Sequence, residues 1–274
     1  MSGMAQVKGR VIVKDDPWSS PSLCLSLGLQ LALQQLRLRY RGSILGYVWT
    51  MVYPLLLLLT YALVFSALFR TSDGAVSPLA SFSSVFFAWL LISSTLNDSV
   101  YSISHAAALM HQTHFPPWIL PFATTLSNLI SFILSLPVVL AILFAVHIHP
   151  TWNLFLIVPL TLLLFCFSLG LCLLISLPSV FFRDMPHIVG IAVTMLFFLS
   201  PIFYTLEHIR DSRLLHGIVL SNPVSYFLEI SRSCFLGSTA SPGIWAGSAL
   251  WALLTLAAGA FVFSRYSTNL GMRI

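Results

Sequence analysis

The most constraining feature of this sequence is the stretch Trp49–Phe69, which contains no charged residue. A helix that crosses the hydrocarbon core of a bilayer needs about 20 mostly apolar residues, and this stretch meets that requirement. Only 8% of the 274 residues are charged, against roughly 25% in an ordinary soluble domain. Five further apolar segments follow, at Phe82–Ser102, Ile119–Val146, Leu154–Leu177, Ile188–Tyr204 and Ile244–Phe263. The sequence therefore predicts an all-α membrane protein with six transmembrane helices.

The segment between the last two apolar spans, at about residues 205–243, has a different composition. It contains two short apolar pieces, Leu214–Leu220 and Val224–Leu236, separated by a Ser-Asn-Pro turn. Each piece is too short to cross a bilayer, where unpaired backbone groups are costly. We therefore expect a re-entrant pair of half-length helices before the last span. Two amphipathic helices lying on the membrane surface are the alternative.

The N-terminal part of the chain divides into a polar tail and a predicted helix. Residues 1–22 lack the apolar core of a signal peptide and are assigned to a cytoplasmic tail. In residues 23–41, apolar and polar side chains form neighbouring stripes at helical spacing. The apolar stripe is Leu25, Leu29, Leu33, Leu36 and Tyr40, and the polar stripe is Gln30, Gln34, Arg37 and Arg41. We expect an amphipathic helix in the cytoplasmic interface, followed by a six-helix transmembrane domain over residues 42–274.

The distribution of Lys and Arg predicts the orientation of the chain, because cytoplasmic segments carry an excess of these residues. With six spans, most of the 13 Lys and Arg residues fall on the side that holds both termini. Those on the opposite side are Arg70, Arg210, Arg213 and Arg232. Both termini are therefore expected in the cytoplasm, and the re-entrant pair on the periplasmic side.

The sequence lacks the motifs of common catalytic sites. It has neither a glycine-rich phosphate-binding loop nor a Gly-x-Ser-x-Gly nucleophile elbow, so we expect no catalytic residue and no cofactor in this chain. His105, His111 and His114 share one loop, but no carboxylate or cysteine lies near them in sequence. We interpret them as solvated polar residues and expect no metal site. The four cysteines are interpreted as small buried hydrophobes.

Charged residues in apolar surroundings are better functional candidates, because a bilayer penalises them. Asp98, Asp184, Glu229 and Arg232 are of this kind. Glu229 and Arg232 are three residues apart, so on a helix they share a face and can pair. The alternative for these residues is a purely structural ion pair or helix cap.

Five sequence blocks together resemble type-2 ABC transporter permeases that export polysaccharides. In chain order they are Leu38–Trp49 with Pro54, His114–Pro116, Phe182–Pro186, Leu199–Tyr204, and Asn222–Arg232 with Gly237. They resemble the entry to the family's first span, its Phe-Pro after the first cytoplasmic loop, its Arg-Asp turn, the end of its fifth span and its periplasmic block. The resemblance covers the chain from Leu31 to its end. It departs from the family at the histidines, where relatives often have a lysine.

The resemblance implies a transport subunit rather than an enzyme. Such permeases form a homodimer around a channel in the bacterial inner membrane, and two separate ATP-binding-cassette ATPase subunits bind ATP and Mg on the cytoplasmic face. The implied substrate is a polysaccharide linked to polyprenyl pyrophosphate, with O-antigen export expected first and capsule or teichoic acid export as alternatives. No nucleic-acid partner is expected. Two competing classes are a membrane-embedded glycan-lipid enzyme, which should show clustered acids or histidines, and a secondary transporter, which often has inverted repeats.

Three groups of candidate residues follow from the interpretation as a transport subunit. The channel is expected between the first and fifth spans, with aromatic contacts from Tyr53, Tyr61, Phe197, Phe198 and Tyr204. The ATPase is expected to act on the loop that contains His105, His111, His114, Phe115 and Pro116. A periplasmic gate is expected at Asn222, Pro223, Glu229 and Arg232.

Three arginines before the first span are candidates for binding the anionic headgroup of the lipid-linked substrate. Arginine suits phosphate oxygens because its guanidinium donates paired hydrogen bonds. Arg37 and Arg41 are four residues apart and would share a helical face, whereas Arg39 would point elsewhere and is the least suited of the three. The alternative is that all three only anchor the helix to anionic lipid and set the topology.

Overall fold

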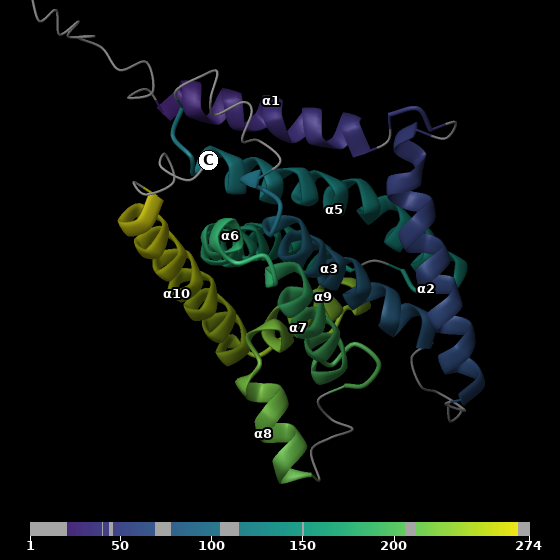
Figure 1. Ribbon diagram of the computed structural model, residues 1–274. Helices are drawn as coiled ribbons and strands as arrows, with labels where there is room; N and C mark the ends of the chain where they lie inside the picture. Colours follow the sequence, from purple (N-terminus) through teal and green to yellow (C-terminus); the bar gives the residue numbers. More distant parts are fainter. Residues whose placement is uncertain are drawn as a thin grey trace, which may run out of the picture.

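The computed structural model describes residues 21–39, 41–43, 46–68, 78–104, 115–149, 151–205 and 212–267. Within these ranges the chain forms helices and no β-strand (Figure 1). The elements are α1 (Pro21–Arg39), η2 (Gly46–Val48), α2 (Trp49–Leu68), α3 (Pro78–Ser99), α5 (Ile119–Ala145), η4 (Trp152–Leu156), α6 (Ile157–Phe181), α7 (Met185–Leu199), α8 (Arg213–Ser221), α9 (Pro223–Leu236) and α10 (Pro242–Tyr266). Each of the predicted apolar spans coincides with a helix, namely α2, α3, α5, α6, α7 and α10.

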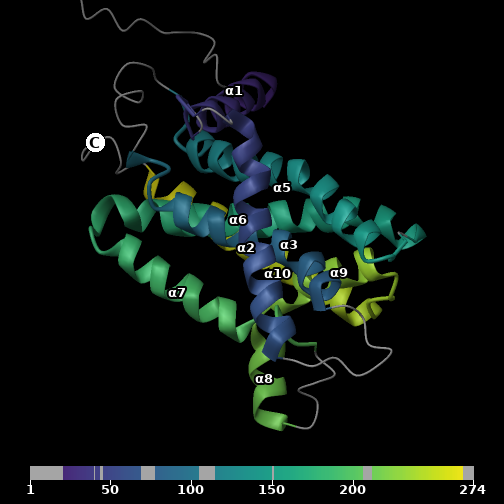
Figure 2. The same ribbon diagram turned by 90° about the vertical axis from the view of Figure 1, so that its right-hand side faces the viewer.

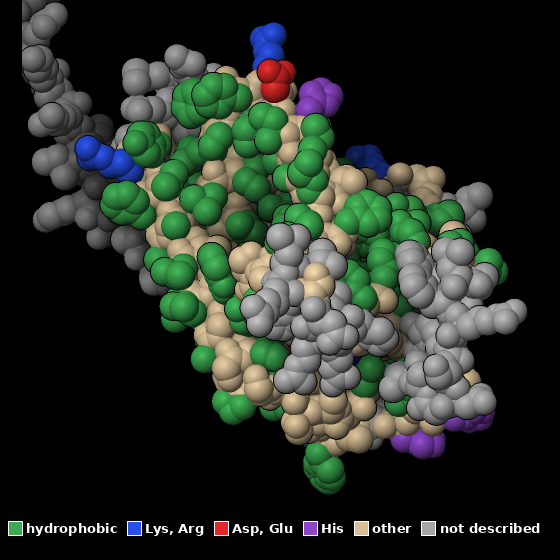
Figure 3. Space-filling view, turned by 90° about the horizontal axis from the view of Figure 1, so that it is seen from below, with side chains coloured by type: hydrophobic (Ala, Val, Ile, Leu, Met, Phe, Trp, Pro, Cys, Tyr) green, Lys and Arg blue, Asp and Glu red, His purple; other side chains and the backbone are tan. Residues whose placement is uncertain are grey.

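Four helices in the described part of the chain are long and apolar enough to cross a membrane. They are Leu79–Ser99, Ile119–Ala145, Trp152–Phe181 and Pro242–Tyr266. Shorter apolar helices occur at Trp49–Tyr61 and Met185–Leu199. Apolar side chains are also spread over the molecular face seen in Figure 3, where charged side chains lie at the margins. The length and composition of these helices therefore suit a membrane protein.

The fifth predicted span ends close to where its sequence indicates. Within the apolar segment Ile188–Tyr204, Pro201 predicts a helix end, and α7 ends at Leu199. Ser200 is extended, with φ of −97° and ψ of 147°. Pro201 explains this, because a proline disfavours the helical conformation of the residue before it.

Helix α3 forms the centre of the domain. Every residue from 82 to 89 is buried, and the helix packs against α2, α5, α6, α7 and α9 (Figures 1 and 2). Small polar residues allow these neighbours to approach and still find hydrogen bonds. The Ser231 hydroxyl of α9, for example, donates to the Ser84 carbonyl at 2.5 Å. Such bonds matter because a bilayer interior offers no water to polar groups.

Helices α6 and α10 pack backbone to backbone at a pair of glycines. A Cβ atom on Gly170 would lie 2.5 Å from the Leu256 nitrogen and the Thr255 oxygen. A Cβ atom on Gly259 would lie 2.5 Å from the Gly170 oxygen. No larger residue fits without moving the helices apart, so the glycines permit the close approach that holds membrane helices together.

Helix α1 lies alongside α5 at the outside of the helical domain, as both ribbon views show (Figures 1 and 2). Its buried side consists of Cys24, Gly28, Ala32 and Leu36. A Cβ atom at Gly28 would lie 2.7 Å from the Phe122 ring, so a larger residue would displace that ring. Short side chains thus bring α1 close to α5.

The apolar stripe predicted for α1 therefore coincides only partly with the side of the helix that is buried. Leu36 is buried, but Leu25, Leu29 and Leu33 are exposed. Leucine stripes are normally expected to face a protein core, whereas α1 packs through its smallest residues and leaves these leucines outward. The outward leucines remain available to contact lipid.

Helices α8 and α9 form where the sequence predicts two short helices. The Asn222 side chain accepts a hydrogen bond from the Val224 N–H at 3.0 Å and caps α9. Pro223 takes the first helical position, where its missing N–H has no cost, and Gly237 ends the helix with φ of 75°. α9 is largely buried and packs against α3, whereas α8 extends away from the domain (Figures 1 and 2).

We predict that Gly170→Leu destabilises the protein by separating α6 from α10. Overpacking a tight contact typically costs about 1–3 kcal/mol, and the melting temperature in detergent should fall accordingly. Gly190→Leu is the matched control, because nothing lies within 4 Å of a Cβ atom at Gly190. Equal melting temperatures for the two variants would contradict the role given to the glycine pair.

Candidate functional site

An aromatic cluster connects α2 with α3 and α7. Its centre is Tyr61, whose ring centroid lies 5.8 to 6.1 Å from those of Phe82, Phe86, Phe197 and Phe203. Aromatic pairs of this kind contribute about 0.5–1.5 kcal/mol beyond the area that they bury. Tyr61 and Phe197, both predicted to line the channel, are half-buried in this cluster.

The other predicted channel residues differ in exposure. Tyr53 on α2 and Phe198 on α7 have exposed fractions of 60% and 66%. Tyr204 is half-buried beyond the end of α7. Tyr53 and Phe198 are therefore the two exposed rings among these aromatics, while Tyr61 and Phe197 hold helices together.

A buried arginine on α9 binds the turn that follows α7. The Arg232 Nη1 group donates to Glu229 Oε2 at 2.6 Å. Its Nη2 group donates to the carbonyl oxygens of Pro201 at 2.6 Å and Tyr204 at 3.3 Å. The predicted pairing of Glu229 with Arg232 is confirmed. The guanidinium thus supplies donors to two backbone carbonyls of the turn that follows α7.

Asn222 makes a second connection between α9 and the same turn. Besides capping α9, its Nδ2 group donates to the Ser200 hydroxyl at 2.9 Å and to the Leu199 carbonyl at 3.4 Å. Asn222 is also buried. Two side chains of one segment therefore hold residues 199–204 against α9.

The environment of Arg232 makes its partner important. Burial lowers the pKa of the Arg232 guanidinium, and the Glu229 carboxylate acts against this shift. Removing one partner of a buried ion pair typically costs about 3–5 kcal/mol, since the other charge stays buried without compensation.

A second ion pair connects α1 with α3 and α5. Arg39 Nη2 donates to Asp98 Oδ2 at 2.7 Å, and Asn128 Nδ2 donates to the same oxygen at 2.9 Å. Arg39 Nη1 also donates to Asn128 Oδ1 at 3.4 Å. Asp98 thus has a charged partner on a helix far from it along the chain.

The remaining arginines of this region are accessible. Arg37 and Arg41 are both exposed. They do not share one helical face as predicted, because α1 ends at Arg39 and Arg41 lies in the next turn. Gly42, with φ of 78°, continues this turn in a conformation that favours glycine.

The predicted ATPase-contacting loop is only partly described. His105, His111 and His114 lie outside the described residues. Phe115 is buried in a cluster with Cys24 of α1 and with the first residues of α5, and Pro116 is half-buried beside it. The Phe-Pro pair therefore connects the end of this loop directly to α1 and α5.

Two polar residues at these junctions are absent from the sequence-based predictions. Asn128 is the one amide in the apolar helix α5, and its position inside a span is the signal that could have identified it. Ser200 precedes Pro201 at a helix end, which resembles an ordinary helix stop. In the described part of the chain, no group of three or more His, Cys, Asp or Glu side chains is placed to hold a metal ion.

The fold and its polar junctions define a helical membrane protein of several apolar helices, tied together by buried side chains on α3, α5 and α9. Residues 28–236 match the family model described as ABC-2 type transporter. The match covers most of the sequence, and the chain belongs to this family. The resemblance carried by the five sequence blocks is therefore confirmed.

Curated relatives extend this comparison. The chain is 32% identical over 211 residues to the O-antigen export system permease protein RfbA of Myxococcus xanthus. This alignment covers 76% of the present chain and 79% of the relative. Two Klebsiella pneumoniae proteins of the same name are 25% and 24% identical, covering 75% and 74% of this chain and 78% and 77% of their own lengths.

We predict that Arg232→Lys lowers the melting temperature in detergent. A lysine keeps the charge, but its compact ammonium cannot bridge Glu229 and the Pro201 carbonyl as the forked guanidinium does. The loss of one charge-assisted hydrogen bond should cost about 1.5–3 kcal/mol. Arg265→Lys, at the exposed end of α10, is the control and should behave like the wild type. A wild-type melting temperature for Arg232→Lys would show that stability does not need the guanidinium to bridge Glu229 and the Pro201 carbonyl.

Proposed function

We propose that this chain is the permease subunit of an ABC transporter that exports O-antigen polysaccharide, linked to polyprenyl pyrophosphate, across the bacterial inner membrane. The observation that carries this proposal is the 32% identity to a permease named for O-antigen export, over 76% of the chain. The family match at residues 28–236 includes both polar junctions, around Asp98 and around Arg232. The names of the relatives favour O-antigen over capsule or teichoic acid.

The proposed assembly contains two copies of this chain and two separate ATPase subunits that bind ATP and Mg. The support from this chain is the apolar surface of α2 and α7. Exposed apolar side chains on these helices are Leu56, Leu59, Ile188, Ile191 and Met195. Such a surface suits contact with lipid or with a second copy. In the proposed homodimer, α2 and α7 of each copy border the channel.

The proposed topology has six spans, with both termini in the cytoplasm and the α8–α9 pair re-entering from the periplasm. Supporting this arrangement, α1 and α8 lie at opposite ends of the domain in both ribbon views (Figures 1 and 2). α1 carries the basic residues Arg37 and Arg39 in its last turn, and an excess of these residues is typical of the cytoplasmic side.

In this proposal, α9 and the turn after α7 move as one unit. Arg232 and Asn222 each bind that turn, so a displacement of α7 would be transmitted to α8 and α9. Helices α8 and α9 would then open or close the periplasmic end of the channel. The ATPase would supply the displacement through the cytoplasmic loop that ends at Phe115 and Pro116.

The proposed function is tested by reconstituting this chain with a candidate ATPase subunit and measuring ATP hydrolysis. The two proteins should co-purify, and lipid-linked O-antigen should stimulate hydrolysis. If the complex assembles but lipid-linked O-antigen does not stimulate its ATP hydrolysis, the proposed substrate is wrong. A chain that binds no ATPase subunit would reject the transporter assembly itself.

Tyr53→Ala combined with Phe198→Ala is predicted to reduce export. Both rings are exposed, so their loss removes flat contact surfaces for sugars without opening a cavity in the protein. Phe261→Ala is the matched control, because Phe261 is 70% exposed on α10, away from the proposed channel. Export is measured as surface polysaccharide in a complemented strain, together with the oligomeric state. Unchanged export in the double variant would contradict the assignment of Tyr53 and Phe198 to the channel lining.

A further prediction concerns Arg37 and Arg41 as the headgroup-binding residues. Replacing both by lysine keeps their charge but removes the paired donors that suit phosphate oxygens. If they bind the pyrophosphate, stimulation of ATP hydrolysis by the substrate should fall several-fold, while the basal rate stays unchanged. Arg265→Lys serves as the control. If the substrate stimulates ATP hydrolysis in the double lysine variant as it does in the wild type, Arg37 and Arg41 do not bind the headgroup and serve only to anchor the helix to lipid.

A further inference from the structure

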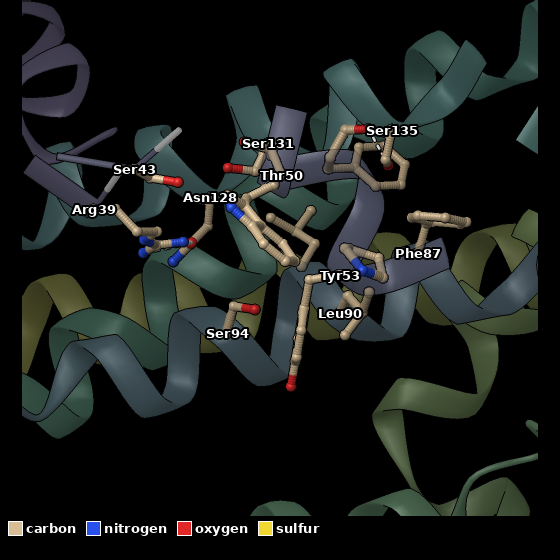
Figure 4. Close-up of a pocket in the computed structure, with 14 residues that line it drawn as sticks. Arg39, Ser43, Thr50, Tyr53, Phe87, Leu90, Ser94, Asn128, Ser131 and Ser135 are labelled. Atoms are coloured by element: carbon tan, nitrogen blue, oxygen red, sulfur yellow. Dashed lines mark hydrogen bonds between the residues drawn. The ribbon is translucent and has the colours of Figure 1, made fainter. Parts of the chain in front are cut away.

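A cavity of about 550 Å³ lies where the end of α1 meets α2, α3 and α5 (Figure 4). Its size is typical of sites for small molecules. None of its lining residues belongs to α7, α8 or α9, so it is separate from the Arg232 junction. Arg37 and Arg41 do not line it, whereas Arg39 and Tyr53, a residue of the proposed channel, do.

The lining changes from polar to apolar along the cavity. Arg39, Ser43 and Asn128 lie at one end, and Phe87 and Ser135 lie toward the other, where the Ser135 hydroxyl already donates to the Phe132 carbonyl of its own helix (Figure 4). The sequences of the lining helices explain this gradient, because α3 presents Ser94, Leu90 and Phe87 in succession. A sugar would favour polar groups throughout the cavity. A graded lining instead suits an amphipathic molecule with a polar headgroup and an apolar chain.

A hydroxyl group inside the cavity lacks a partner. Thr50 lines the cavity and is only 6% exposed. Its Oγ1 atom has no hydrogen-bond partner within the described part of the chain. Buried polar atoms are usually paired, and each exception calls for an explanation. A ligand in the cavity would supply the missing partner.

The charged lining residue at the polar end, Arg39, is paired with the Asp98 carboxylate, which is not itself one of the lining residues. Arg39 lines the cavity and forms the 2.7 Å ion pair with Asp98, and Asn128 contacts both. The side chains of Arg39 and Asp98 are each 37% exposed, so each retains surface for a further contact. A purely anionic headgroup would compete with Asp98 for Arg39. A headgroup with both charges can place its phosphate near Arg39 and its ammonium near Asp98.

We infer that this cavity binds a zwitterionic phospholipid, with its phosphate and ammonium at the Arg39–Asp98 pair, its glycerol region at Thr50 and an acyl chain against Phe87. This site goes beyond the proposed transport function, because it concerns a membrane lipid rather than the exported glycan. The bound lipid would fix the end of α1 against α2, α3 and α5.

The test is lipid titration of the full-length protein, in the oligomeric form in which it purifies, followed by native mass spectrometry. Phosphatidylethanolamine and phosphatidylglycerol are the probes. The wild type should retain phosphatidylethanolamine more strongly than phosphatidylglycerol. Thr50→Val should weaken retention of phosphatidylethanolamine by about tenfold, as expected for one lost hydrogen bond. Its matched control is Thr60→Val on the same helix, because the Thr60 hydroxyl bonds its own helix at the Leu56 carbonyl.

A second variant tests the charge balance independently of Thr50. Asp98→Asn keeps an oxygen that accepts from Arg39 but removes the negative charge, so the preference should change toward phosphatidylglycerol. The inference is overturned if the wild type prefers phosphatidylglycerol or retains neither lipid. It is also overturned if Thr50→Val binds like Thr60→Val, or if Asp98→Asn keeps the wild-type preference.

Discussion

The structure depends on a constraint that soluble proteins do not face, namely that burial in lipid gives helices no hydrophobic reason to associate. Close contact and hydrogen bonds must hold them instead. In this protein the close contact is most direct at Gly170 and Gly259, where the backbones of α6 and α10 touch. The hydrogen bonds concentrate on α3 and α9, through Ser231 and Arg232. A small number of residues therefore determines how the apolar helices are arranged.

Much of this arrangement follows from patterns that the sequence displays locally. Apolar runs predict the six helices, the Asn-Pro turn predicts the start of α9, and the spacing of Glu229 and Arg232 predicts their ion pair. These predictions succeed because each depends on neighbours within one or two helical turns. The end of α7 also follows from a local pattern, because Pro201 disfavours a helical conformation at Ser200 although the apolar segment continues to Tyr204.

The remaining features depend on contacts between distant segments, which no local pattern contains. Arg39, Asp98 and Asn128 come from three helices, and their association becomes visible only when α1 lies against α5. The same contact decides which side of α1 is buried. There, the short side chains of Gly28 and Ala32 prevail over the more hydrophobic leucines, because α5 can approach only the narrower side. The candidate sites for substrate and for lipid are therefore less predictable than the helices.

The shortness of α7 has a consequence for the surrounding bilayer. As the proposed fifth span, its 15 residues extend about 22 Å at 1.5 Å per residue, whereas the hydrocarbon core is about 30 Å thick. The helix cannot compensate by extending beyond Leu199, because Asn222 and Arg232 hold the following turn in place. Lipid adjusts to such a hydrophobic mismatch by thinning. In the proposed six-span topology, the membrane beside α7 would therefore be thinner than elsewhere around the protein, and a polar polymer moving along this helix would have a shorter apolar distance to cross.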